Sequence, residues 1–122
     1  MTPLTLECRQ LITGVLITVA GEIDCSNADR LESYTTRMSR SGQPLVLDLS
    51  GLSFMDSSGL HTLLRLNAAA HPQGLYLAAV HPMPARVLQI TKVWDIMNIH
   101  PTVDGAVAAA LSDSVAGLPE TP

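Results

Sequence analysis

Residues 45–66, LVLDLSGLSFMDSSGLHTLLRL, restrict the fold of this chain more than any other segment. The segment begins with a dense apolar run over residues 45–49, which is typical of a buried strand. It ends in an amphipathic helix whose expected inner face is formed by Leu60, Leu63, Leu64 and Ala68. A buried strand that passes directly into a helix is half of a strand–helix–strand unit. The segment therefore predicts an α/β domain with parallel strand pairing.

Short β-rich runs recur on both sides of this segment. The first two runs are separated by a turn near Thr13 and Gly14, which predicts an antiparallel hairpin at the N-terminus. Later runs are separated by helix-like segments, which predicts parallel pairing with right-handed crossovers. The expected strands cover residues 4–9, 15–20, 45–49, 75–80 and 96–99.

Helix starts can be recognised from capping residues and prolines. Ser26, followed by Asp29, resembles a capping box and predicts a helix that begins at Ser26. Pro82 and Pro84 stand where another helix should begin. The first helix should turn four residues toward the core, namely Ala28, Leu31, Thr35 and Met38. The two remaining helices are expected from Ser57 and from Thr102.

These elements predict one α/β domain with a mixed sheet of four to five strands and about four covering helices. A chain of 122 residues can bury one substantial core. We expect the domain to span residues 1–111. Residues 112–122 are small and polar, so we expect them to form a flexible tail.

Charge and cysteine content exclude several classes of function. The net charge of −4 and seven scattered Lys and Arg residues argue against nucleic-acid binding. Cys8 and Cys25 form no disulfide framework or metal-ligand cluster, and we expect both to be buried as small apolar residues. The four histidines lack metal-binding spacing, and no apolar run is long enough to span a bilayer. We expect a soluble, cytoplasmic monomer without a metal ion.

The junction between the central strand and helix, residues 56–59, carries an acid and two hydroxyls. Asp56 or Ser57 can cap the helix by accepting a hydrogen bond from a free backbone N–H. We expect Gly59 to let another surface approach closely. One capping residue would suffice for the helix, so the second hydroxyl, that of Ser58, suggests a further role.

Three kinds of chemistry compete at this junction. A nucleophile elbow requires the pattern G-x-S-x-G, whereas the frame around Ser57 begins with Met55. A phosphate-binding loop is not supported, because neither GxxxxGK[ST] nor GxGxxG occurs in the chain. The third possibility is a serine that another enzyme modifies, with the base, metal and ATP supplied by that enzyme. This role suits a small acidic protein without catalytic groups of its own.

GEID at residues 21–24 and LVLDLSGLSFMDSSGL at residues 45–60 resemble anti-sigma factor antagonists built on the STAS domain. The resemblance covers nearly the whole chain and implies a STAS-type fold. It also implies a cytoplasmic, non-enzymatic regulator of transcription, such as those of stress responses. When unphosphorylated, such a protein binds an anti-sigma factor serine kinase and so releases a sigma factor. The kinase uses its own ATP and Mg²⁺, and a serine phosphatase reverses the modification.

The resemblance also assigns roles to individual residues. It implies that Ser58 is the phosphorylated serine. The partner surface would then include Asp24, Asp56, Ser57, Gly59 and His61. His61 stands where a small residue is common in the family. Two alternatives stay open at this point: a stand-alone STAS module that binds a nucleotide or other small ligand, and an uncommon serine hydrolase.

Overall fold

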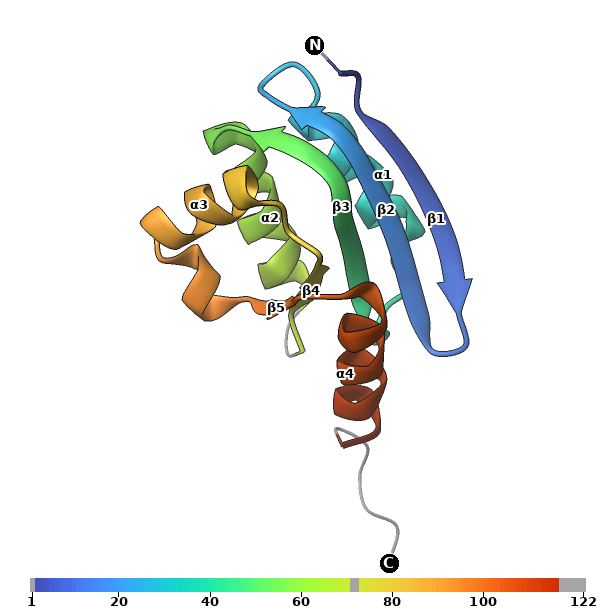
Figure 1. Cartoon of the computed structure of the whole chain (residues 1–122). Helices are drawn as coiled ribbons and strands as arrows, with labels where there is room; N and C mark the ends of the chain where they lie inside the picture. The colour runs from blue at the N-terminus through green and yellow to red at the C-terminus, as the bar shows by residue number, and fades with distance from the viewer. Residues whose placement is uncertain (1, 71–72, 117–122) are drawn as a thin grey trace, which may run out of the picture.

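A five-stranded mixed sheet forms the centre of the molecule, in a computed structural model that describes residues 2–70 and 73–116. The strand order is β1-β2-β3-β4-β5. β1 and β2 form an antiparallel hairpin, and the other neighbouring strands are parallel. The predicted mixed sheet with an N-terminal hairpin is therefore confirmed (Figure 1). The strands are β1 Thr5–Leu11, β2 Gly14–Ile23, β3 Leu45–Met55, β4 Leu75–Ala78 and β5 Asn98–His100.

Four α-helices and one 3₁₀ helix connect or follow these strands within the described part of the chain. They are α1 Ala28–Met38, α2 Ser57–Ala69, α3 Pro82–Ile90, η1 Val93–Ile96 and α4 Val103–Ala116. Four α-helices agree with the prediction. However, α4 continues past residue 111, where the predicted tail begins. Residues 117–122 of that tail lie outside the described residues.

The main core lies between one face of the sheet and helices α1, α2 and α3. Leu47 of β3, Leu31 of α1, Leu63 of α2 and Leu88 of α3 are all fully or almost fully buried in it. Ala28, Leu31 and Thr35 of α1 are buried as predicted, and Met38 packs against the core. For α2, the predicted inner face is partly wrong. Leu66 is buried, whereas Ala68 is exposed.

Among the described helices, α4 is the one that packs on the opposite face of the sheet. Leu16, Val46, Tyr76 and Ala78 of the sheet form a second buried cluster with Ala106 and Ala110 of α4. The Tyr76 hydroxyl donates a hydrogen bond to Asp113 Oδ2 at 2.5 Å. Burial, followed by this hydrogen bond, raises the pKa of Tyr76 well above its usual range. The alanines of α4 have small side chains, so the helix can pack closely on the sheet.

β3 and the segment around β5 differ most from the predicted strands. β3 extends to Met55 rather than ending at Leu49, and its pairing with β2 shifts register near Ala20 and Glu22. Gly51 permits this pairing, because a Cβ there would lie 2.7 Å from the Ala20 Cβ. The predicted strand 96–99 is instead η1 followed by β5, after Lys92 turns the chain with a φ of 63°. The longer β3 carries the chain directly to Asp56.

Thr35 generates a prediction about stability. Its Oγ1 is buried and has no hydrogen-bond partner among the described residues. Because an unpaired buried hydroxyl carries a desolvation cost, Thr35→Val should raise the free energy of unfolding by about 1 kcal/mol. Chemical denaturation measures this change. Thr36→Val, at the exposed neighbouring position, is the matched control and should change stability by less than about 0.5 kcal/mol. A lower stability for Thr35→Val would contradict the assignment.

Candidate functional site: the loops that follow β2 and β3

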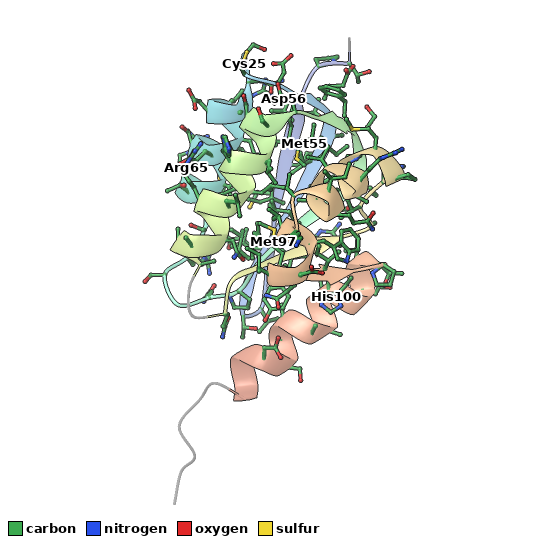
Figure 2. The ribbon with its side chains drawn as sticks, turned by 90° about the vertical axis from the view of Figure 1, so that its left-hand side faces the viewer. Cys25, Met55, Asp56, Arg65, Met97 and His100 are labelled. Atoms are coloured by element: carbon green, nitrogen blue, oxygen red, sulfur yellow. The ribbon has the colours of Figure 1, made fainter. Side chains whose placement is uncertain are left out.

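The carboxyl ends of β2 and β3 are neighbours, and the loops that follow them form the candidate site. Ile23 is paired with Met55 at the end of the two strands. The pairing continues one step further, because the Asp56 amide donates to the Ile23 carbonyl oxygen at 3.2 Å. Cys25 and Asp56 consequently lie at the same end of the molecule (Figure 2). The two motifs GEID and DSSGL are thus brought together by parallel strand pairing.

Asp56 is the N-cap residue of α2. Its Oδ1 accepts hydrogen bonds from the backbone amides of Ser58, at 2.9 Å, and Gly59, at 3.4 Å. The predicted cap is therefore confirmed, and Asp56 rather than Ser57 provides it. Ser57 is exposed and Ser58 is partly exposed. Because Asp56 supplies the cap, neither serine hydroxyl is required to hold the end of the helix.

Gly59 has a packing role. It is buried, and a Cβ at this position would lie 2.4 Å from Met55 Cγ and 3.0 Å from Ile23 Cγ2. The absence of a side chain therefore lets α2 approach the ends of β2 and β3 closely. The surface that approaches Gly59 closely is thus the chain's own core, and a place for Gly59 in a partner surface stays a prediction. Met55 lies in the core and Phe54 is partly buried.

Asp24 organises the neighbouring loop. Its Oδ1 accepts hydrogen bonds from the Ser26 amide, at 2.9 Å, and from the Ser26 hydroxyl, at 2.5 Å. The hydrogen bond from the Ser26 hydroxyl, and then that from its amide, holds the pKa of the Asp24 carboxyl below its usual range. Asp24 is partly exposed, so it places a negative charge at the same end of the molecule as Asp56.

The predicted capping box at Ser26 is wrong. Helix α1 begins at Ala28 with Asn27 as its N-cap residue, and Asn27 makes no side-chain cap hydrogen bond. The Asn27 side chain instead accepts from the Asp24 amide at 3.0 Å and donates to the Glu22 carbonyl oxygen at 2.9 Å. Ser26 lies one residue before the N-cap position, and its amide and hydroxyl both donate to Asp24 instead.

His61 extends the candidate site along α2. His61 is exposed and lies one turn after Ser57, and Arg65 is exposed one further turn along. Arg65 forms an ion pair with Glu32 of α1, with 2.7 Å between Nη2 and Oε1. This ion pair raises the pKa of Arg65 and joins the two helices beside the site.

Cys25 belongs to the candidate site but was missed by the sequence analysis. It was expected to be buried, yet it is exposed in the loop between β2 and α1, whereas Cys8 is partly buried. Its position between Asp24 and Ser26 of the GEID turn is the signal that could have identified it.

The arrangement does not favour catalysis by the two serines. Within residues 2–70 and 73–116, neither Ser57 nor Ser58 has a hydroxyl hydrogen bond to a histidine, as an activated serine nucleophile requires. Among the described residues, no group of three His, Cys, Asp or Glu could hold a metal ion. None of the described helices has the length and apolar character needed to cross a membrane.

The fold and the site define a small α/β domain of the STAS class. The chain belongs to the STAS domain family, whose model matches residues 4–106. It is 34% identical over 92 residues to an anti-sigma F factor antagonist of Paenibacillus polymyxa, covering 71% of this chain and 79% of that protein. It is also 35% identical over 77 residues to osmosensory protein A of Mycobacterium tuberculosis. That match covers 63% of this chain and only 48% of the relative, about half its length.

The architecture agrees with a solved structure of an anti-sigma factor antagonist from Mycobacterium paratuberculosis. The two structures superpose with a TM-score of 0.81 at 27% sequence identity. The match covers 88% of this chain and 94% of the other. This chain is thus similar, in sequence and in structure, to proteins that are named anti-sigma factor antagonists.

The cap generates a second prediction. Asp56→Ala should lower the free energy of unfolding by about 1 kcal/mol, because two backbone amides of α2 lose their acceptor. Asp56→Asn retains a side-chain oxygen that can accept these hydrogen bonds, so its free energy of unfolding should fall much less. Thermal and chemical denaturation of both variants provide the test. Equal stabilities for the two variants would contradict a capping role for the Asp56 side chain.

Proposed function

We propose that this protein is an anti-sigma factor antagonist controlled by phosphorylation of Ser58. Unphosphorylated, it would bind an anti-sigma factor serine kinase and thereby release a sigma factor. The kinase would transfer phosphate from its own ATP and Mg²⁺ to the Ser58 hydroxyl, and a serine phosphatase would remove it. On this proposal the protein acts in the cytoplasm, as a monomer, without a cofactor of its own.

The observation that carries the proposal is the position of Ser58 in the first turn of α2. Ser58 is partly exposed, and its backbone amide, rather than its hydroxyl, is used by the Asp56 cap. A kinase requires an accessible hydroxyl on a defined backbone, and this turn meets that requirement. Membership of the STAS family and similarity to anti-sigma factor antagonists support the same interpretation.

Phosphorylation would change charge more than structure. A phosphoserine adds a charge of about −1.5 to −2 and three acceptor oxygens. At the N-terminus of α2 this charge is favourable, because backbone N–H groups and the positive end of the helix dipole lie there. We therefore expect the fold around Ser58 to stay intact after modification.

The effect on a bound partner would be much larger. Asp56 accepts from the Ser58 amide, and Asp24 follows Ile23, whose carbonyl pairs with the Asp56 amide, so a phosphate adds to an acidic surface. Burying an unpaired charge in an interface costs on the order of 3–5 kcal/mol. Because about 1.4 kcal/mol corresponds to a tenfold change in affinity, one phosphate could weaken the complex by more than about a hundredfold.

The proposed partner surface contains Asp24, Asp56, Ser57, Ser58 and His61. These residues come from the loop after β2, the turn after β3 and the first two turns of α2. All of them are exposed or partly exposed. The exposed Cys25 lies within the same surface and becomes an additional contact on this proposal.

Phosphate mapping and affinity measurements test the proposal. The protein is incubated with purified anti-sigma factor kinase domains, ATP and Mg²⁺, and the phosphate is located by mass spectrometry. We expect phosphate on Ser58, none on Ser58→Ala, and phosphate still on Ser58 in Ser57→Ala, the matched control. Calorimetry should then show binding of the unmodified protein and at least about a hundredfold weaker binding of the phosphorylated form.

Two results would count against the proposal. Phosphate found only on Ser57 would refute the assignment of the modified residue. Unchanged affinity of Ser58-phosphorylated protein would refute the proposed switch.

A further inference from the structure

The chain leaves β4 and β5 toward opposite faces of the sheet. The two strands are parallel neighbours, with Ala78 paired to His100. After β4 the chain enters α3, whose Leu88 lies in the main core, whereas after β5 it enters α4, whose Ala106 lies in the second cluster. In open α/β sheets, ligands bind in the crevice that forms outside the carboxyl ends of strands where the connections separate in this way.

A cavity of about 300 Å³ lies at this point. It is lined by residues of the segment after β4, of η1, and of the end of β5, namely Ala79, Val80, Trp94, Ile99, His100 and Pro101. We refer to it as the β4–β5 crevice. Five of these residues are partly buried and Pro101 is exposed, so the crevice opens to solvent. Trp94 is partly buried and packs against the main core.

The backbone at the crevice is held in an unfavourable conformation. Ala79 has a φ of 56°, in the left-handed region that non-glycine residues rarely adopt. Its amide donates to the His100 carbonyl oxygen at 3.0 Å, which ties the two sides of the crevice together. The His100 ring stacks on Tyr76, with 6.3 Å between ring centroids. Such strain persists where the surrounding structure over-determines it, which is common at ligand sites.

We propose that the β4–β5 crevice binds a small, uncharged, planar ring compound. Its lining residues are apolar except for His100, and they include no acidic residue, lysine or arginine. The partly buried Trp94 indole offers a surface on which a ring can stack, and His100 offers a polar partner. At roughly 30 Å³ for each water-sized group, the volume suits about ten non-hydrogen atoms.

This site is separate from the Ser58 turn. His100 lies beside α4, whereas Asp56 and Cys25 lie at the far end of the molecule (Figure 2). In Figure 1, the start of α2 likewise lies near the top of the molecule, whereas β5 lies lower, close to α4. The inference therefore goes beyond the proposed function and does not depend on it.

Nuclear magnetic resonance titration tests the crevice directly. Trp94 is the only tryptophan, so its indole N–H gives a single identifiable signal in an ¹⁵N-labelled sample. Benzimidazole, a neutral planar ring compound, is the probe. Cyclohexanecarboxamide, which has the same number of non-hydrogen atoms but no planar ring, is the control ligand. We expect saturable shifts at Trp94, Val80 and Ile99 with benzimidazole, and at least about tenfold weaker binding of the control.

Two substitutions of the same kind complete the test. Val80→Phe should fill the crevice and abolish the shift at Trp94. Ile90→Phe, at a position 72% exposed and outside the crevice, should leave binding unchanged. If Val80→Phe does not fold, the titration of the unsubstituted protein with the two ligands still tests whether the crevice binds a planar ring. No saturable shift at Trp94, equal binding of both ligands, or shifts centred on residues 56–58 would each overturn the proposal.

Discussion

The hydrogen bonds of the Asp56 carboxylate are the constraint on which the candidate site depends. This carboxylate accepts hydrogen bonds from two backbone amides in the first turn of α2. The Asp56 amide itself continues the pairing of β3 with β2. Gly59, packed on Met55 and Ile23, holds the next residue of the turn against the core. The backbone on both sides of Ser58 is therefore held by groups other than the Ser58 hydroxyl. A modification of that hydroxyl can change the surface while the supporting hydrogen bonds stay in place.

The same sheet supports two separate regions of the molecule. The ends of β2 and β3 bring the acidic GEID and DSSGL turns together, because parallel neighbouring strands end at the same edge. The ends of β4 and β5 instead separate α3 from α4 and leave the crevice beside Trp94. The first region is polar and acidic, which suits a protein partner. The second is apolar and concave, which suits a small ring compound.

Local signals in the sequence predicted much of this arrangement. The cap of α2 was predictable because an N-cap acts within three residues, and the hairpin and mixed sheet followed from the order of strands and helices. The extension of β3 was not predictable, because Ser50, Gly51 and Ser53 interrupt its apolar pattern. The capping box at Ser26 was wrong because α1 begins two residues later, at Ala28, and Ser26 belongs to the Asp24 turn before it. The crevice depends on which face of the sheet each helix covers, and no local pattern encodes that choice.

The most direct test of the central claim is a comparison of ¹H–¹⁵N spectra of the unmodified protein and protein carrying phosphoserine at position 58. If Asp56 and Gly59 hold the turn independently of the Ser58 hydroxyl, amide shift changes should be confined to residues 24–27 and 54–62. The signals of β4, β5 and α4 should then coincide in the two spectra. Large shift changes in those distant elements would contradict a rigid, independently capped turn. Much faster hydrogen exchange of the Gly59 amide after phosphorylation would contradict it too.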